Sequence, residues 1–198
     1  MGSHFFALFS RMKYIDRWSL MRNTDSESLS QHSLDVAAIA HALAVIGNRR
    51  LGKNYDTGKI ALIGIYHDMP EIITGDMPTP VKYHSSEIRE AFGKIEKSAQ
   101  NSLLMTLPED LRGDFLELIK PDEQSEEYRI VKAADKISAL LKCMLEEKNG
   151  NSEFTKAGEA TKRSLYDMNC PEAEIFLDEF IDSYSQVLDT VLSTEDQI

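Results

Sequence analysis

Two histidines and two aspartates in this chain have the types and spacing of ligands for one divalent metal ion. His32 is followed 35 residues later by the adjacent pair His67-Asp68, and Asp135 comes 67 residues after Asp68. Both aspartates lie in apolar segments, where an unpaired carboxylate would be costly to bury. One shared ion would satisfy both carboxylates and leave coordination positions open for a substrate oxygen and a water, as in hydrolytic sites. Capping or pairing of the two aspartates is the alternative explanation.

The other three histidines lack these features. His41 lies nine residues beyond His32, about 900° of helical rotation, and therefore faces the opposite side of the same predicted helix. His4 and His84 have no carboxylate neighbours in helical register. We therefore expect all three to be packing or surface residues.

The composition limits the class of partner. The 198 residues are 42% hydrophobic and 28% charged, as in ordinary globular domains. The formal net charge of −11 argues against DNA or RNA, and no stretch approaches the roughly 20 apolar residues of a membrane span. Because the net charge is +3 over residues 1–60 and −14 over residues 61–198, an anionic partner must be attracted locally, which suits a phosphorylated small molecule.

Two cysteines without a secretory signal predict reduced thiols and a cytoplasmic protein.

Hydrophobic residues recur at helical spacing over most of the chain, and no alternating strand pattern of useful length is present. The sequence therefore predicts an all-α fold, a compact helical bundle forming one domain over residues 1–198 with a frayed C-terminus. Asp56 and either Ser85 or Ser86 are expected N-caps. The loop 74–80 holds two prolines and a glycine, so we expect a stiff segment that shapes a pocket. The predicted helices cover residues 5–13, 30–47, 56–67, 85–103, 108–119, 123–148, 153–166 and 171–192.

Several longer motifs resemble one protein family. The pattern His…His-Asp…Asp on helices resembles the HD-domain superfamily of metal-dependent phosphohydrolases, and the closer resemblance is to the bacterial HD-domain 5′-deoxynucleotidases of the YfbR type. The similarity covers nearly the whole chain and weakens after about residue 147. It is carried by Ser3-His4-Phe5-Phe6-Ala7, Arg17-Trp18-x-Leu20-Met21-Arg22-Asn23, Ser30-x-His32-Ser33-Leu34, His67-Asp68-x-x-Glu71, Thr74-Gly75-Asp76-x-Pro78-Thr79-Pro80-Val81-Lys82-Tyr83, Asp135 and Leu141-Lys142-Cys143.

The resemblance implies a metal-dependent 5′-deoxynucleotidase. Such an enzyme hydrolyses deoxyribonucleoside 5′-monophosphates to the deoxyribonucleoside and phosphate, accepts several bases and rejects ribonucleotides. The resemblance also implies one divalent ion held by His32, His67, Asp68 and Asp135. Imidazole ligands favour Co, Mn, Fe or Zn over Mg or Ca, but the sequence does not choose among them.

The same resemblance implies roles for five further residues. Glu71 is expected to act as general base on the attacking water, and Arg17 to grip the phosphate through two hydrogen bonds. Trp18 is expected to pack where a 2′-hydroxyl would sit, so that ribose is rejected. Asp76 is expected to help hold the deoxyribose and position the leaving oxygen, and Thr79 to contact the substrate. Core packing, a surface ion pair or a turn would explain each of these residues if they stood alone.

One position departs from the family pattern. Pro70 lies between His67-Asp68 and Glu71, where the family usually has another residue. A proline there removes a backbone donor and strains the preceding helical turn. We therefore expect the helix to end after Asp68 and a short new one to begin, which leaves the placement of Glu71 open.

Two other kinds of function compete with this one. Other HD-type enzymes act as cyclic-nucleotide phosphodiesterases or on nucleotides with more phosphates, but they would want more basic residues or a second metal cluster. A non-catalytic, metal-binding nucleotide sensor would not need Glu71 and Arg17 beside all four ligands. The apolar positions on the long helices, together with the family habit, also predict a homodimer.

Overall fold

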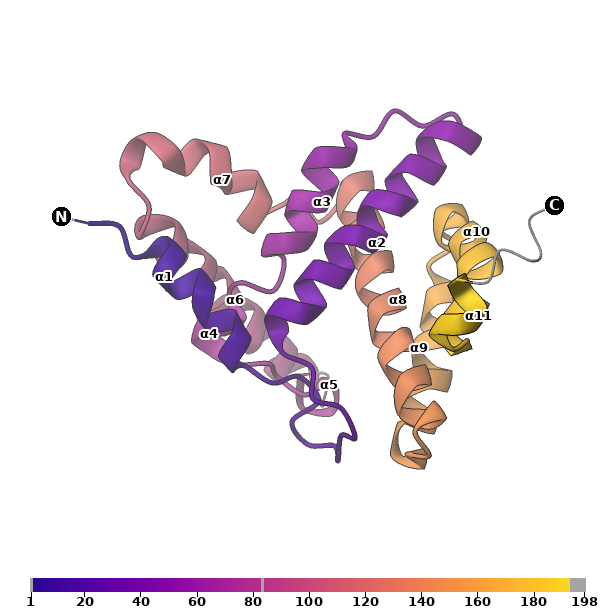
Figure 1. Cartoon of the computed structure of the whole chain (residues 1–198). Coiled ribbons are helices and arrows are strands. Elements are labelled where there is room, and N and C mark those ends of the chain that lie inside the picture. Colours follow the sequence, from indigo (N-terminus) through magenta and orange to yellow (C-terminus); the bar gives the residue numbers. More distant parts are fainter. Residues whose placement is uncertain (1, 83, 193–198) are drawn as a thin grey trace.

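Helix α2, Leu29–Arg50, and helix α8, Glu126–Lys148, cross at the centre of the fold and contribute His32 and Asp135. Helix α3, Thr57–Tyr66, packs along α2 and also contacts α8 (Figure 1). The computed structural model describes residues 2–82 and 84–192, and all regular structure there is helical apart from one isolated bridge between Asp16 and Ser28. The predicted all-α fold is therefore confirmed.

The remaining helices flank this centre on two sides (Figure 1). These flanking helices are α1 Phe5–Phe9, η1 Ser10–Tyr14, α4 Glu71–Thr74, α5 Thr79–Lys82, α6 Ser86–Met105, η2 Glu109–Leu111, α7 Arg112–Ile119, η3 Ser152–Phe154, α9 Thr155–Asp167, α10 Pro171–Phe180, η4 Ile181–Ser185 and α11 Leu188–Leu192. One hydrophobic cluster lies among α2, α3, α8 and α10, and a second one lies among α1, α6 and α7.

Side-chain caps fix where the long helices begin. Ser28 forms a capping box with Gln31 at the start of α2. Asp56 accepts a hydrogen bond from the Lys59 amide at α3, and Ser85 caps α6, so both predicted caps are confirmed.

A close approach between α2 and α3 sets the separation of the two histidines. A Cβ atom on Gly64 would lie 2.8 Å from the Ala37 Cα, so only glycine allows the backbones to come this near. Gly64 is one turn before His67, and Ala37 is little more than one turn after His32. The crossing therefore brings the two imidazoles to a ring-centroid distance of 5.3 Å.

A helix end before Pro70 was predicted, but α3 stops at Tyr66 and not after Asp68. A proline ring clashes with the carbonyl of the residue four positions earlier, which here is Tyr66, the last residue of α3. The chain continues as a turn through His67 and Asp68, and α4 begins at Glu71 with Pro70 as its N-cap.

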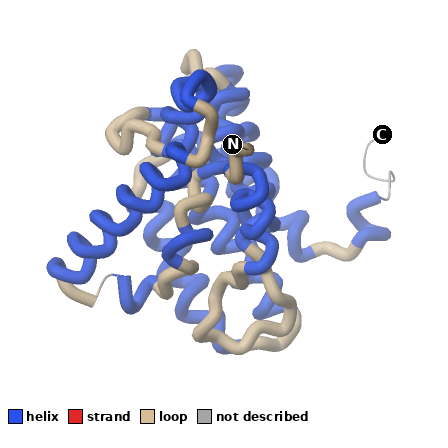
Figure 2. The backbone as a smooth tube through the Cα atoms, turned by 90° about the vertical axis from the view of Figure 1, so that its left-hand side faces the viewer, coloured by secondary structure: helices blue, strands red, loops and turns tan. Residues whose placement is uncertain are grey.

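Other boundaries differ from the sequence prediction. The predicted helix 171–192 is divided into α10, η4 and α11, although it contains no internal proline or glycine. Every side chain of residues 182–192 is exposed, so little packing favours one continuous helix there, and α11 stands apart from the main body (Figure 2). The predicted loop 74–80 is also partly helical, because Thr79 already begins α5.

Helix α2 is long and apolar enough, by length and composition, to cross a membrane. However, 56% of its most apolar window is buried within the fold, against α3, α8 and α10. The core helix of a folded domain has the same properties, so this feature is weak evidence for a membrane span.

Candidate metal centre and active site

The four predicted ligands meet where α2, the end of α3 and α8 converge. Ligand atoms of His32, His67 and Asp135 all lie within 4.8 Å of one another. Asp135 Oδ1 is 3.2 Å from His32 Nε2. Asp68 Oδ2 is 3.1 Å from His67 Nε2 and 3.5 Å from His32 Nε2. Residues far apart in the chain thus bring two imidazole nitrogens and the Asp135 carboxylate around one point, and the Asp68 carboxylate lies beside both nitrogens.

The histidine nitrogens that face this point have no hydrogen-bond partner. Both Nε2 atoms are buried and make no hydrogen bond, although carboxylate oxygens lie 3.1 to 3.5 Å away. Such burial is costly unless something else binds the nitrogens. The Nδ1 atom of His67 lies 2.7 Å from the Gly64 carbonyl and donates to it, so that Nε2 faces the other predicted ligands. His32 Nδ1 is 3.0 Å from the Ser138 hydroxyl. This arrangement, with an outer hydrogen bond orienting each imidazole, fits a divalent transition metal ion.

Both aspartates are ionised at neutral pH despite their burial. Burial alone would raise the pKa of Asp68, but the neighbouring His67 and His32 hold that pKa well below its usual range. Lys132 and His32 do the same for the pKa of Asp135, and Lys132 forms an ion pair with it. Both charged carboxylates therefore add negative charge around the two imidazole nitrogens.

Glu71 lies beside the four predicted ligands even though Pro70 interrupts the helix. Its amide donates to the Asp68 carbonyl at 3.0 Å, so the turn brings both residues to the same place. Its Oε2 atom is buried without a hydrogen-bond partner. Burial first, and then the negative charges of Asp68 and Asp76, raise the pKa of Glu71 to about 10. Such a shifted carboxyl in a polar cluster is typical of a functional site.

Arg17 and Trp18 lie on the 15–28 loop, which joins η1 to α2 and borders the cluster. Glu27 Oε2 accepts hydrogen bonds from Arg17 Nη1 at 3.1 Å and from Trp18 Nε1 at 3.2 Å. Arg17 Nη1 also lies 2.7 Å from His32 Nδ1, and the buried Arg17 Nε has no partner. One carboxylate thus places a guanidinium and an indole side by side next to the predicted ligands.

Asp76 and Thr79 differ in how they relate to this cluster. Burial raises the pKa of Asp76, while Arg17 and a hydrogen bond from the Trp18 backbone partly offset the rise. These interactions place the Asp76 carboxylate beside the 15–28 loop. The Thr79 side chain is exposed at the start of α5, and within the described ranges it makes no hydrogen bond to the other predicted site residues.

Three residues of this arrangement were missed in the sequence. Glu27, Lys132 and Ser138 contact Arg17, Asp135 and His32 respectively. Lys132 and Ser138 lie three residues before and after Asp135 on α8, so helical spacing from Asp135 was the signal that could have found them. Glu27 lies in an irregular loop and gives no periodic signal.

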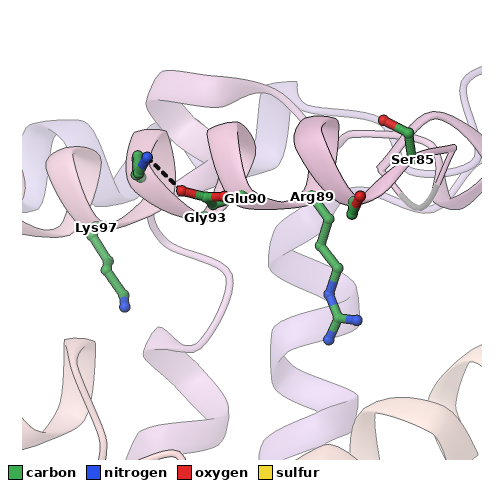
Figure 3. A pocket seen from close by; sticks show the side chains of 7 residues that line it. Ser85, Arg89, Glu90, Gly93 and Lys97 are labelled. Carbon is green, nitrogen blue, oxygen red and sulfur yellow. Dashed lines mark hydrogen bonds and ion pairs between the residues drawn. The ribbon is translucent and has the colours of Figure 1, made fainter.

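A separate hollow runs along α6 and shares no residue with the cluster. Ser85, Ser86, Arg89, Lys94 and Lys97 are among the residues that line it (Figure 3). Lys94 pairs with Glu90 at 2.6 Å, one helical turn away. These features are those of a solvated helix face.

Known proteins resemble this chain over nearly its whole length. The family model described as 5′-deoxynucleotidase YfbR-like matches residues 4–184. A 5′-deoxynucleotidase of Pectobacterium atrosepticum is 48% identical over 96% of each chain, and one of Yersinia pestis is 46% identical over 96% of each.

Two solved structures share the fold at lower identity. An HD-domain phosphohydrolase from Listeria innocua has a TM-score of 0.81 and 23% identity, covering 91% of this chain and 88% of that one. The cyanophage S-2L HD phosphohydrolase DatZ, bound to dA and one catalytic Zn²⁺, has a TM-score of 0.62 and 18% identity, covering 89% and 96%. At these identities the likeness concerns the fold alone.

Proposed function

The chain belongs to the YfbR-like 5′-deoxynucleotidase family, and we propose that it hydrolyses deoxyribonucleoside 5′-monophosphates to the deoxyribonucleoside and phosphate. The observation that carries the proposal is that a candidate metal-binding group and a candidate substrate-binding group lie next to each other. The two unpaired imidazole nitrogens lie beside ionised Asp68 and Asp135, and Arg17 and Trp18 share the Glu27 carboxylate next to them. A phosphate and a sugar would thus be met by adjacent parts of one site.

His32, His67, Asp68 and Asp135 are the residues that would hold one divalent ion, which we propose to be Co, Mn, Fe or Zn. When bound, the ion would supply positive charge that acidifies a water molecule, offsets the phosphate charge and draws the pKa of neighbouring carboxyls down. Gly64 and Ser138 orient the two imidazoles, and Lys132 holds Asp135. The two unpaired nitrogens and two carboxylates support this assignment.

The remaining residues would bind and orient the substrate and move a proton. Arg17 would donate to the phosphate oxygens, since its Nε atom has no partner within the protein. Glu71 Oε2 would take the proton of the attacking water as the bond to phosphorus forms and the bond to the 5′-oxygen breaks. The leaving oxygen would take a proton from solvent to become the 5′-hydroxyl. Asp76 would help hold the deoxyribose and the leaving oxygen. Thr79 would need to reach the substrate from its exposed position on α5.

A direct test compares phosphate release from dAMP and AMP with protein stripped by EDTA and refilled with Mn²⁺ or Co²⁺. We expect release from dAMP only after refilling, and release from AMP about 10²-fold lower, because a hydroxyl forced against a rigid indole loses its water partners. Equal release from both substrates would contradict the role of Trp18 and leave the metal assignment standing. Release from neither substrate would favour another HD-type substrate, such as a phosphodiester, or a non-catalytic nucleotide sensor.

Replacing Trp18 with alanine should specifically admit ribonucleotides. The smaller side chain leaves room for a 2′-hydroxyl and its water, so we expect kcat/KM for AMP to approach that for dAMP within about tenfold. Phosphate release from several deoxynucleotides should stay similar to one another, since we propose that several bases are accepted. A variant that still rejects AMP would show that another residue provides the selectivity.

We also propose a cytoplasmic homodimer. Both cysteines are free and buried, which suits a reducing compartment. Several large apolar side chains on the long helices are exposed, including Leu34 and Leu145, and a symmetric partner would cover such residues.

A further inference from the structure

The carboxylate of Glu146, near the end of α8, is fully buried and saturated with hydrogen bonds. Its side chain is 0% exposed. Its oxygens accept from the Thr24 amide at 2.9 and 3.1 Å, from the Thr24 hydroxyl at 2.7 Å and from the Asp25 amide at 3.2 Å. Asn151 Nδ2 donates at 2.8 Å, and Lys142 forms an ion pair with it. A charge buried with this many donors is costly to disturb.

These bonds join α8 to the 15–28 loop, across more than 120 residues of sequence. Two partners of Glu146 strengthen the same connection. Asn151 Nδ2 also donates to the Arg22 carbonyl at 2.7 Å, and Lys142 donates to the Asp25 carbonyl. Figure 1 shows the loop near the C-terminal end of α8. The middle of the loop is therefore fixed by the cluster of Lys142, Glu146 and Asn151, which lies apart from the predicted metal ligands.

The fixed part of the loop leads directly to Trp18, whose backbone is strained. Trp18 has a φ of 58°, in the left-handed region that a bulky residue rarely adopts. Asn23, adjacent to Thr24, donates through Nδ2 to the Trp18 carbonyl at 3.3 Å. The indole packs on Phe154 at a centroid distance of 5.4 Å, and the Lys142 ammonium lies 5.5 Å from the centroid of the same Phe154 ring. A strained conformation persists only when surrounding contacts hold it.

We infer that Glu146 is a positioning residue for Trp18: by fixing the middle of the 15–28 loop, it holds the indole in the place that excludes ribonucleotides. The sugar selectivity part of this inference rests on the proposed function. The connection from Glu146 through Thr24 and Asn23 to Trp18 does not, because it concerns contacts within the protein. The two parts can therefore be tested separately.

The first experiment measures Trp18 itself, since this is the single tryptophan of the chain. In Glu146→Gln one carboxylate oxygen becomes an NH₂ group, which is a donor. In either orientation of the amide this group faces donors of the loop or of Asn151, so hydrogen bonds are lost and the loop should loosen. We expect the emission maximum to move to longer wavelength and acrylamide quenching to increase, while the far-UV circular dichroism and the affinity for Co²⁺ stay unchanged. An unchanged indole emission in a folded Glu146→Gln protein would overturn the inference.

Glu172→Gln is a matched control for the loss of a buried charge. Glu172 is also 0% exposed, but its partners Tyr55, Cys170 and Arg129 all lie outside the 15–28 loop. We expect this variant to lower Tm without changing the indole emission. If both variants change the emission equally, the effect is a general loss of packing and the positioning role is wrong.

Thr24→Val provides a milder change if Glu146→Gln does not fold. Valine keeps the shape of threonine and removes the 2.7 Å hydroxyl bond to Glu146, together with the bond that this hydroxyl accepts from Asn149 Nδ2 at 3.2 Å. The emission change should have the same direction and a smaller size. No change in this variant together with an unfolded Glu146→Gln would mean that Glu146 serves stability alone.

The second experiment measures selectivity as the ratio of kcat/KM for dAMP to that for AMP. We expect Glu146→Gln to lower this ratio by about tenfold and to have no further effect on it in a Trp18→Ala background, because both changes act through one side chain. Equal loss of both activities, or additive effects of the two substitutions on the ratio, would overturn the positioning role. If the unmodified protein does not discriminate between dAMP and AMP, the proposed sugar selectivity fails, while the fluorescence result still tests the connection from Glu146 through Thr24 and Asn23 to Trp18.

Discussion

Replacing His67 with alanine is expected to lower phosphate release from dAMP by at least about 10³-fold and to weaken metal binding strongly. His67 supplies one of the two unpaired imidazole nitrogens, and its ring is already oriented by the Gly64 carbonyl at 2.7 Å. Alanine offers no ligand atom, and no other side chain of the described cluster can replace a nitrogen there. An electrostatic contribution of several kcal/mol is lost, and each 1.36 kcal/mol corresponds to a factor of ten in rate.

The measurement combines the rate of phosphate release with the affinity for Co²⁺ or Zn²⁺ in a competition with a chromophoric chelator. His41→Ala is the matched control, because His41 is an exposed histidine on α2 outside the cluster. The control should keep both the rate and the metal affinity. Metal-dependent activity at the normal level in His67→Ala would show that the ion binds elsewhere.

The parts of the site that lie on long helices could be predicted from the sequence. His32 and Asp135 belong to α2 and α8, where hydrophobic periodicity fixes which face is buried. His67 and Asp68 stand directly after the apolar run of α3, and Pro70 indicates that this helix ends before them. Burial of the two aspartates, together with the type and spacing of the two histidines, therefore pointed to the same four residues as the family resemblance.

The parts that depend on irregular backbone could not be predicted in this way. The 15–28 loop has no periodicity, and its conformation is fixed by contacts with Glu146 and Asn151, which are more than 115 residues away in the chain. Nothing local indicates that Trp18 has a positive φ or that Glu27 is shared by two side chains. The division of the last predicted helix was missed for a related reason, because helical periodicity does not show whether a face finds a partner.

Replacing Glu71 with glutamine is the second change with a large expected effect. If Glu71 accepts the proton of the attacking water, glutamine removes the base and keeps the shape, so kcat should fall by about 10²- to 10⁴-fold. KM for dAMP and metal affinity should change little, because Glu71 is not among the predicted ligands. Phosphate release at saturating dAMP and chelator competition measure these three quantities.

The structure also predicts that this substitution leaves the fold intact, which separates a catalytic role from a structural one. Burial and the charge of Asp68 raise the pKa of Glu71 to about 10, so the carboxyl is neutral in the metal-free protein at pH 7. Glutamine is a neutral side chain of the same size, and Tm of the metal-free variant should therefore be equal to or above that of the unmodified protein. A carboxyl whose pKa is raised by folding destabilises the folded protein once the pH exceeds its pKa in the unfolded chain. Removing this carboxyl should therefore raise Tm most at neutral and higher pH. A large drop in Tm, or a kcat within a few-fold of normal, would remove Glu71 from the proposed mechanism and leave Asp76 as the next carboxylate to test.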